Sequence, residues 1–297
     1  MDMVATMDSF PEAGQTVLGK TIGFYPGGKG ANQCVAIARL GGDVEMIGML
    51  GDDANGDVFR DIMKKEGVCT EHLYKTSVPT AVAQIQINKE GQNRICVIPS
   101  ANYEFGPSEL EAIDSVIKNT SLIVLQYEIR LDIVEEIIKR ASAAGARVLL
   151  NPAPAAEISS EALSLVDYIT PNETELAIIT GMPTETDEEV ILAAKKLLSM
   201  GVKNVVATLG ARGALIVNDS VCEIVRGYKA TPVDTVAAGD SFNGALAVML
   251  TEGHTLKDAV SFANAMGALT IQVKGAIPSM HTRAEVEEFL KTAEIQY

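Results

Sequence analysis

The thirty residues SLIVLQYEIRLDIVEEIIKRASAAGARVLL, positions 121–150, contain one complete strand–helix–strand unit. Ser121–Gln126 is an apolar run of strand length, and Val148–Leu150 begins a second one. Leu131–Ala144 has the helical period, with one apolar face formed by Ile133, Val134, Ile137 and Ile138. A helix between two strands predicts that the strands are parallel and that the helix covers their sheet. This stretch therefore indicates an α/β fold.

The same alternation continues toward the C-terminus. Tyr168–Thr170 and Asn204–Thr208 have strand length, and Glu188–Met200 between them repeats apolar residues at helical spacing. Three more helices are predicted, at Ala238–Leu250, Leu256–Ile271 and Arg283–Ala293. Strands and helices in this order predict a three-layer, Rossmann-like α/β fold with helices on both sides of a sheet.

The first hundred residues have a different pattern. Ala31–Leu40 and Asp57–Glu66 are predicted helices of the main layers, but Thr80–Ser100 predicts an antiparallel hairpin because turn-forming residues separate two strand-like runs. Together with Thr16–Phe24, this hairpin predicts a small β-sheet lid over one face of the sheet. We expect a single α/β domain, residues 1–297, with lid strands at about 12–26 and 80–102 inserted within it.

Composition narrows the class of protein. Hydrophobic residues make up 47% and charged residues 21%, which is typical of a globular protein. The formal net charge of −15, without a basic cluster, repels a phosphodiester backbone, so nucleic acid is not an expected partner. No apolar run reaches the length of a membrane span, and the first residues do not resemble a signal peptide. We therefore expect no membrane contact and a cytoplasmic location.

The four cysteines are widely spaced, without a C-x-x-C pair and without histidines at metal-ligand spacing. Free cysteine is most often a buried, small apolar side chain. That environment is expected for Cys34, Cys69, Cys96 and Cys222.

Gly14–Thr21 matches the phosphate-binding P-loop pattern G-x-x-x-x-G-K-[ST] letter for letter. A P-loop must follow a strand and open a helix, so that helix N-terminal amides face the phosphates. Here Pro11 precedes the pattern, glycines and Pro26 follow it, and its interior residues favour a strand. The match is therefore interpreted as coincidental, and Lys20 is not assigned to a nucleotide site.

Asp234–Leu246 is the segment best suited to chemistry. Ala237, Ala238 and Gly239 would leave backbone N–H groups open at the start of a helix, where an anion is favoured. Asp240 in the same first turn is placed to accept a proton from a hydroxyl, although spacing alone is equally consistent with a helix-capping aspartate. Ser241 only approximates the nucleophile elbow of hydrolases, and no histidine is placed to serve it as a base.

Four segments, taken together, resemble the ribokinase, or phosphofructokinase-B, family of sugar kinases. Asp234–Leu246 is similar to the C-terminal signature of that family, and Pro26–Gln33 to its N-terminal signature. Pro171–Glu175 and Leu209–Gly213 resemble its two nucleotide-site motifs. The four segments occur in the order of the family and span nearly the whole chain, which makes a chance match improbable.

The resemblance implies a role for each matching residue. Asp240 would be the general base. The backbone amides of Ala237, Ala238, Gly239 and Asp240 would form the anion hole. The sugar would be bound by Asp2, Gly28, Lys29, Gly30, Ala31, Asn32, Glu128 and Asp240. Asn172 and Glu175 would serve ATP and its Mg²⁺, and the nucleotide would also be bound by Thr208, Leu209, Gly210, Ala211, Arg212, Gly213, Gly239 and Asn264. A monovalent cation such as K⁺ would be bound by Asp234, Val236, Thr270, Val273, Gly275 and Ser279.

The resemblance also implies the reaction: transfer of the ATP γ-phosphoryl group to the primary 5-hydroxyl of ribose, by a homodimer joined through the β lid. One alternative is a kinase of the same family that acts on another substrate, such as deoxyribose, fructose, a ketodeoxy sugar acid or a nucleoside. A second alternative is a protein that binds sugar or nucleotide without turnover.

One departure from the family concerns the N-terminus. The family opens with a buried apolar strand and a Gly-Ser-x-Asn segment ahead of the aspartate matched to Asp2, and this sequence has neither. We therefore expect the sheet to lack its first strand and Asp2 to lie on an unsupported terminus. Such a chain would be either a trimmed form of a longer protein or a weakened relative.

Overall fold

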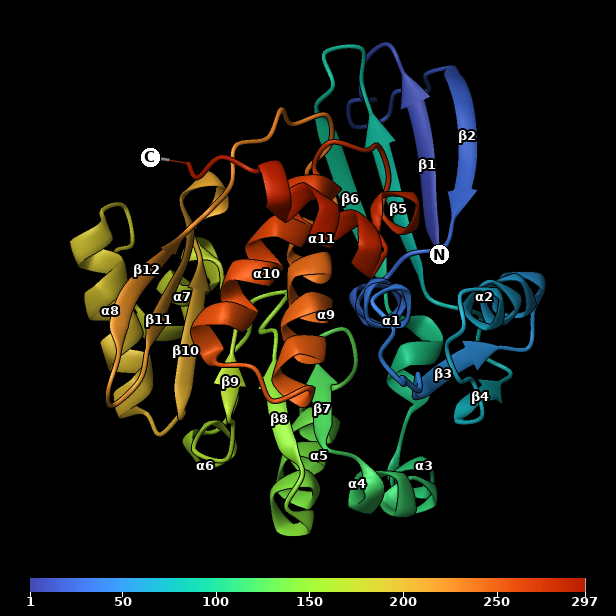
Figure 1. Ribbon diagram of the computed structural model, residues 1–297. Coiled ribbons are helices and arrows are strands. Elements are labelled where there is room, and N and C mark those ends of the chain that lie inside the picture. Colours follow the sequence, from blue (N-terminus) through green and yellow to red (C-terminus); the bar gives the residue numbers. More distant parts are fainter. Residues whose placement is uncertain (297) are drawn as a thin grey trace.

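A six-stranded sheet forms the centre of the computed structural model, which describes residues 1–296 (Figure 1). Its strand order is β12-β11-β10-β9-β8-β7. The four strands β7 to β10 are parallel, and β11 and β12 continue the sheet as antiparallel neighbours. Their bounds are β7 Leu122–Leu125, β8 Arg147–Leu150, β9 Tyr168–Ile169, β10 Asn204–Thr208, β11 Gly213–Val217 and β12 Cys222–Arg226.

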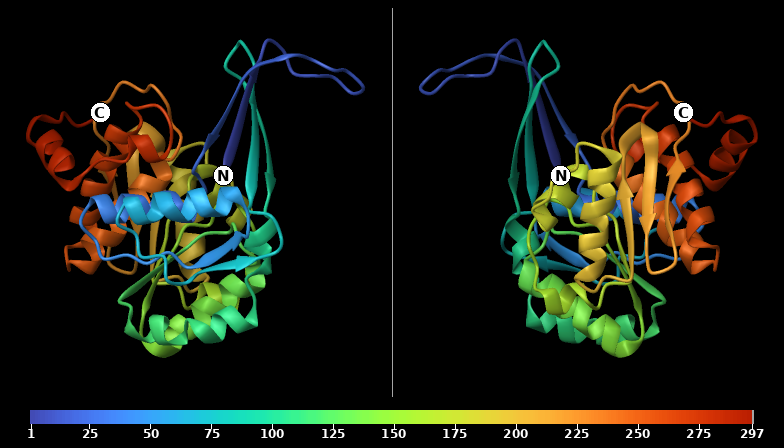
Figure 2. Two further views of the ribbon diagram at one scale, coloured as in Figure 1. Left: turned by 90° about the vertical axis from the view of Figure 1, so that its right-hand side faces the viewer. Right: turned by 90° about the vertical axis from the view of Figure 1, so that its left-hand side faces the viewer.

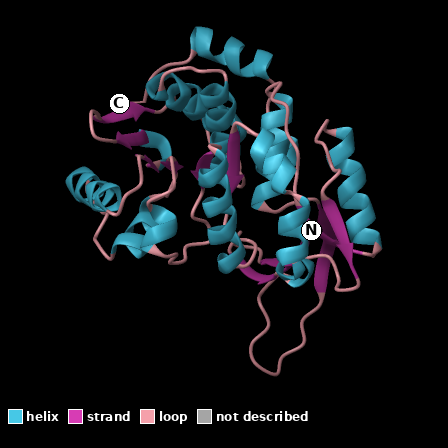
Figure 3. Ribbon diagram, turned by 90° about the horizontal axis from the view of Figure 1, so that it is seen from below, coloured by secondary structure: helices cyan, strands magenta, loops and turns pink. Residues whose placement is uncertain are grey.

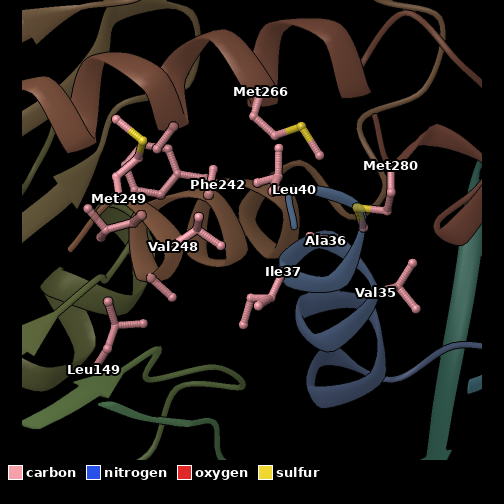
Figure 4. Close-up of a cluster of buried hydrophobic side chains, with 14 of the residues drawn as sticks. Val35, Ala36, Ile37, Leu40, Leu149, Phe242, Val248, Met249, Met266 and Met280 are labelled. Atoms are coloured by element: carbon pink, nitrogen blue, oxygen red, sulfur yellow. The ribbon is translucent and has the colours of Figure 1, made fainter. Parts of the chain in front are cut away.

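Helices cover both faces of this sheet, because successive side chains of a strand point to opposite faces (Figures 1 and 3). Leu149 and Val206 pack with one hydrophobic cluster, and Val148 and Val205 with the other. The first cluster is built mainly from α1 Lys29–Arg39, α9 Ala238–Thr251, α10 Leu256–Thr270 and α11 Arg283–Thr292 (Figure 4). The second is built mainly from α5 Leu131–Ala144, α6 Ser160–Leu163, α7 Glu173–Thr180 and α8 Asp187–Ser199. The predicted three-layer fold is confirmed.

Helices α1 and α9 pack closely at Gly244. A Cβ atom added at Gly244 would lie 2.5 Å from the Cβ of Ala36 and 3.1 Å from the carbonyl oxygen of Gln33. Glycine therefore allows the two backbones to approach, and the Ile37 backbone also lies beside the contact (Figure 4). This contact fixes α1, whose first turn carries Lys29 and Asn32, against the first turn of α9.

The lid is a separate four-stranded sheet that projects from the main body (Figure 2). The expected hairpin is present, and the strand expected at Thr16–Phe24 begins three residues later and ends one residue later, at Gly19–Tyr25. The order is β2-β1-β5-β6, with bounds β1 Asp2–Met7, β2 Gly19–Tyr25, β5 Val82–Ile87 and β6 Asn93–Ile98.

The unforeseen fourth strand, β1, corrects the expectation for the N-terminus. Asp2 does not lie on an unsupported end, because it pairs with Tyr25 of β2 and with Ala83 of β5. The Met1 amine donates to the carbonyl of Ala81 at 2.9 Å. The N-terminal residues are therefore held between two other strands of the lid.

A third, two-stranded sheet lies beside β7 without being joined to it (Figure 1). It consists of β3 Gly48–Gly51 and β4 Leu73–Thr76, which are parallel and connected through α2 Ala54–Lys65. The short helices α3 Pro107–Ala112 and α4 Asp114–Asn119 lead from the lid back to β7. Within residues 1–296, β7 pairs only with β8 and β3 only with β4.

Two further expectations can be compared with the structure. Lys20 lies in strand β2 and not at the start of a helix, which agrees with the rejection of the P-loop pattern. The expectation of buried cysteines was wrong for Cys69, Cys96 and Cys222, which are exposed, and Cys34 is only partly buried. Cys96 and Cys222 lie on strands with exposed positions, which a count of cysteines does not reveal.

None of the helices in residues 1–296 has the length and hydropathy required to cross a membrane.

Candidate active site

Asp240 lies in the first turn of α9 and is only 7% exposed. Its carboxylate accepts hydrogen bonds from Asn32 Nδ2 at 2.8 Å and from Gln33 Nε2 at 3.1 Å. Both donors belong to α1, so the contact between α1 and α9 holds the carboxylate in place. The helix-capping interpretation of Asp240 receives no support, since no side chain caps α9.

Burial raises the pKa of Asp240 above its usual value, while the charge of Lys29 and the bonds from Asn32 and Gln33 lower it. The two donors stabilise the ionised form and the desolvated position favours the protonated form. A carboxylate under these opposing influences is more basic than an exposed aspartate and still has partners in its charged state. That is the behaviour required of a general base.

A chain of buried amides extends behind Asp240, and the sequence analysis missed it. Gln33 Nε2 also donates to Asn151 Oδ1 at 3.1 Å, and Gln33 Oε1 accepts from Gln126 Nε2. Thr170 donates to Asn243 at 2.6 Å on the same side of α9. The signal was present in the sequence as polar residues at the ends of apolar strands, where ligand sites of parallel sheets form.

Asp2, Lys29 and Glu128 bring charge to the opposite side of Asp240. The Lys29 backbone N–H donates to Glu128 Oε2 at 2.7 Å. A Cβ at Gly27 would lie 2.2 Å from an oxygen of Asp2, so only glycine fits beside this carboxylate. Burial is the main cause that raises the pKa of Asp2 and that of Glu128.

These residues surround one cavity of about 700 Å³. All the residues predicted to bind the sugar line it: Asp2, Gly28, Lys29, Gly30, Ala31, Asn32, Glu128 and Asp240. The Oδ1 atom of Asn32 is buried and has no hydrogen-bond partner among the described residues. Because an unpaired buried acceptor is costly, a ligand hydroxyl that donates to it would be favoured.

The start of α9 is open to an anion. Ala237 has a positive φ of 62°, and the amides of Gly239 and Asp240 have no acceptor in the described part of the chain. A Cβ at Gly239 would meet no atom within 4 Å, so the space above these amides is clear. The Ala238 amide is directed to the Thr235 carbonyl at 3.3 Å, which leaves it less available than expected.

Most residues predicted to bind the nucleotide lie at the start of α7, at the end of β10 and in the turn that follows it, whereas Gly239 lies in α9 and Asn264 in α10. Thr208 forms a bridge with Asn172, and Asn172 caps α7 by a reciprocal pair of bonds with Glu175 of 2.8 and 2.9 Å. Leu209 and Gly213 close a tight turn through Gly210 and Ala211, and Arg212 forms ion pairs with Glu173 and Asp187. Asn264 uses its amide donor on the carbonyls of Val225 and Arg226.

The residues predicted to bind a monovalent cation lie in two segments. Asp234 and Val236 precede α9, and the others lie between the end of α10 and Ser279. Asp234 accepts the Val236 amide at 3.0 Å and the Gly275 amide at 2.9 Å, which joins the two loops. Gly275 has a φ of 91°, a bend that favours glycine. The set is completed by Thr270, whose carbonyl accepts the Val273 amide, and by Ser279, whose hydroxyl donates to Ala276.

Known proteins of one family resemble this chain over most of its length. The sequence profile described as pfkB family carbohydrate kinase matches residues 1–283. A ribokinase of Haemophilus influenzae is 36% identical over 98% of this chain and 96% of its own length. A deoxyribokinase of Salmonella typhi is 32% identical, with coverages of 99% and 97%.

Among solved structures, the ribokinase of Arabidopsis thaliana, complexed with ribose and ATP, superposes with a TM-score of 0.90. It is 34% identical, and the match covers 98% of this chain and 95% of that one. Sequence and fold therefore agree over nearly the whole length of both proteins. The chain belongs to the pfkB family of carbohydrate kinases and is an ATP-dependent sugar kinase.

Proposed function

We propose that this kinase phosphorylates the primary 5-hydroxyl of ribose, with Asp240 as the general base. The observation that carries the proposal is the position of Asp240. Its buried carboxylate lies in the same helical turn as two open amides, and it lines a cavity in which the acceptor atom of Asn32 is unpaired. A hydroxyl placed there has a base beside it and an anion site next to that base.

In the proposed reaction, the sugar hydroxyl transfers its proton to Asp240 while its oxygen attacks the γ-phosphorus of ATP. The bond from this phosphorus to the bridging oxygen breaks, and ADP leaves. The amides of Gly239 and Asp240 stabilise the negative charge that accumulates on the transferred group. Glu128, Asn32 and Asp2 orient the sugar, because their oxygens accept hydrogen bonds from hydroxyls.

Mg²⁺ and a monovalent cation are part of the proposal. When bound, Mg²⁺ would neutralise charge on the ATP phosphates. Glu175 suits this role because its capping bond uses Oε2, and Oε1 has no partner among the described residues. The Asp234 loops suit a potassium-like ion because they combine a carboxylate with backbone carbonyls, which are hard oxygen donors.

The choice of ribose rests on the ribokinases among the relatives, and deoxyribose is the second candidate because a deoxyribokinase is also similar to this chain. The test is ADP formation with ribose, deoxyribose, fructose, a ketodeoxy sugar acid and a nucleoside at equal concentrations. We expect the highest kcat/KM with ribose. Faster turnover of another substrate would replace ribose, and no sugar-dependent ADP formation would support a protein that binds without turnover.

We also propose a homodimer formed through the lid. The strand register places Ile22 and Phe24 of β2 on the same lid face as Ile98 of β6, and all three are exposed. Ile95 and Val97 point to the opposite face and line the sugar cavity. An exposed apolar face on the outer side of a lid is typical of a protein–protein contact.

A further inference from the structure

The two open amides of the anion site belong to peptides whose carbonyl groups point the other way, into the protein. The Gly239 N–H shares its peptide with the Ala238 carbonyl, and the Asp240 N–H shares its peptide with the Gly239 carbonyl. Both peptides are trans. In a planar trans peptide the C=O and N–H bonds point in opposite directions, so a group that holds the carbonyl also sets the direction of the N–H.

A buried side chain of α9 bonds each of these carbonyls from behind. Ser241 Oγ donates to the Ala238 carbonyl at 2.9 Å, and Asn243 Nδ2 donates to the Gly239 carbonyl at 2.8 Å. The exposed fractions of Ser241 and Asn243 are 0% and 1%. Each open N–H therefore has a side-chain donor at the opposite end of its own peptide.

Each of the two side chains has a threonine partner on a neighbouring element. Thr170, which follows β9, donates from Oγ1 to Asn243 Oδ1 at 2.6 Å. This bond occupies the oxygen of the Asn243 amide, so the nitrogen is the end that faces Gly239. On α10, Thr270 Oγ1 lies 2.8 Å from Ser241 Oγ. Both threonines are buried, at 2% and 0% exposure, and they hold the two side chains in one orientation.

Polar side chains in the buried part of α9 are confined to its start. Every residue from Asp240 to Leu250 is buried, and those after Asn243 are apolar or glycine. A buried polar side chain costs free energy unless its hydrogen bonds are made, so packing alone favours apolar residues at positions 241 and 243 as well. The two polar side chains are therefore better explained by the carbonyls that they bond than by the core.

We propose that Ser241 and Asn243 are positioning residues of the anion site, an inference that rests on the proposed role of the Gly239 and Asp240 amides. Each side chain fixes the plane of one peptide and polarises it, because a carbonyl that accepts a hydrogen bond makes the N–H of the same peptide a stronger donor. The amides are then aimed before phosphoryl transfer begins and need no reorganisation during it. Ser241 acts from behind the site and not as a nucleophile, since its hydroxyl is directed to Ala238.

The first test compares Ser241→Ala, Asn243→Ala and Asn243→Ser in steady-state kinetics, with the sugar that the chain turns over fastest. Outright removal of one donor from such a site lowers kcat by about 10²–10³, so a misdirected donor should lower it less, by about tenfold in each alanine variant. The KM values for ATP and sugar should stay nearly unchanged, because the amides act on charge that develops in the transition state. Asn243→Ser should recover most of the loss, because a serine hydroxyl in a helix reaches the carbonyl four residues earlier.

A second measurement needs no turnover. Carbonyl carbon NMR resonances of Ala238 and Gly239 are recorded in the ligand-free proteins, because a hydrogen bond to a carbonyl oxygen shifts its carbon downfield. Ser241→Ala should move the Ala238 carbon upfield and leave the Gly239 carbon largely in place. Asn243→Ala should do the reverse, and Asn243→Ser should return the Gly239 carbon toward its original position.

Thr180→Val is the matched control. The Thr180 hydroxyl is also buried, at 3% exposure, and also donates to a helix carbonyl, that of Leu176 at 2.7 Å, but it lies at the end of α7. This variant should lose stability in denaturant unfolding and keep the kcat of the original chain.

Thr170→Val is the second variant if Asn243→Ala does not fold. It removes the hydroxyl that orients the Asn243 amide and leaves Asn243 itself in place. Thr170→Val should lower kcat and move the Gly239 carbon upfield. Original values of both would contradict the proposed link.

Equal kcat values in Asn243→Ala and Asn243→Ser would overturn the proposal, as would raised KM values with an unchanged kcat. Unmoved carbonyl resonances would also overturn it, whether or not a sugar is turned over. A failure of the proposed function has a different signature. In that case Asp240→Asn would keep a normal kcat, or no sugar would be phosphorylated, while the two carbonyl carbons still responded as expected.

Discussion

At the scale of single residues, the buried carboxylate of Asp240 is expected to decide turnover. Asp240→Asn keeps an acceptor for one of the bonds from Asn32 and Gln33 but cannot take a proton. We expect kcat to fall by about 10²–10⁴, while ATP and sugar affinities change by only a few fold. Steady-state kinetics and ligand titration check this. Asp219→Asn on an exposed turn is the control.

If Asp240→Asn weakened sugar binding and left kcat near normal, Asp240 would be a positioning residue and another group would accept the proton. Burial of a carboxylate does not by itself distinguish these roles, since both require the same contacts with α1. Separate measurements of kcat and of sugar affinity do distinguish them.

Lys20 tests the rejected P-loop. In the structure its ammonium pairs with Asp8, and both side chains are largely exposed, at 57% and 68%. An exposed ion pair contributes little stability, and the lid strand β2 provides no helix N-terminus for phosphates. Lys20→Ala should therefore leave the KM for ATP and kcat nearly unchanged. A large rise in the KM for ATP would show that the pattern does bind nucleotide.

At the scale of secondary-structure elements, the contact between α1 and α9 couples packing to chemistry. Gly244→Ala would place a Cβ 2.5 Å from Ala36, so α1 must shift and carry Asn32 and Gln33 away from Asp240. We expect a loss of about 1–3 kcal/mol in the free energy of unfolding, and a lower kcat in the folded protein. Denaturant unfolding and kinetics measure the two effects.

Gly267→Ala is the matched control in α10. A Cβ there meets only the Ala238 carbonyl, at 3.9 Å, and alanine favours a helix over glycine by about 0.5–1 kcal/mol. This variant should be as stable as the original or more so. Equal losses in both variants would mean that the effect of Gly244→Ala does not come from the close contact.

At the scale of the whole molecule, the lid is expected to join two copies. Ile22→Lys combined with Phe24→Lys places two charges on the outer lid face, far from the cavity face of Ile95 and Val97. Light scattering should show a dimer for the original chain and a monomer for this variant. Leu192→Lys, at an exposed apolar position on α8, should remain dimeric. A monomeric original chain would refute the proposed interface.

The whole molecule also shows why the N-terminus was not predicted correctly. The sequence of Asp2–Met7 is short and mixed, and its partners are 12 to 81 positions away, at Gly19 and Ala83 among others. Strand pairing over such distances depends on which edges the rest of the fold leaves open, and no local pattern contains that information. In the main sheet, β7 is an edge strand among residues 1–296.

The sequence by itself determined the family and those elements that have a clear local period. Leu131–Ala144 and Asn204–Thr208 were predicted to the residue, because helical and strand periods are local properties of side chains that face a core. The signature segments around Lys29 and Asp240 identified the kinase family because their small residues and carboxylates leave a recognisable pattern. No partner of either residue had to be known for this.

Only the tertiary structure decided how Asp240 is held and which surfaces stay open. Gln33, Asn151 and Gln126 come from different elements, and they meet behind Asp240 only after α1 packs on α9 and the strand ends align. The exposure of Cys96 and the unpaired edge of β7 likewise depend on neighbours distant in sequence. The burial of a side chain, its pKa and the pairing of a strand edge all depend on residues that come together only in the folded chain. For this physical reason, the sequence alone could not predict them.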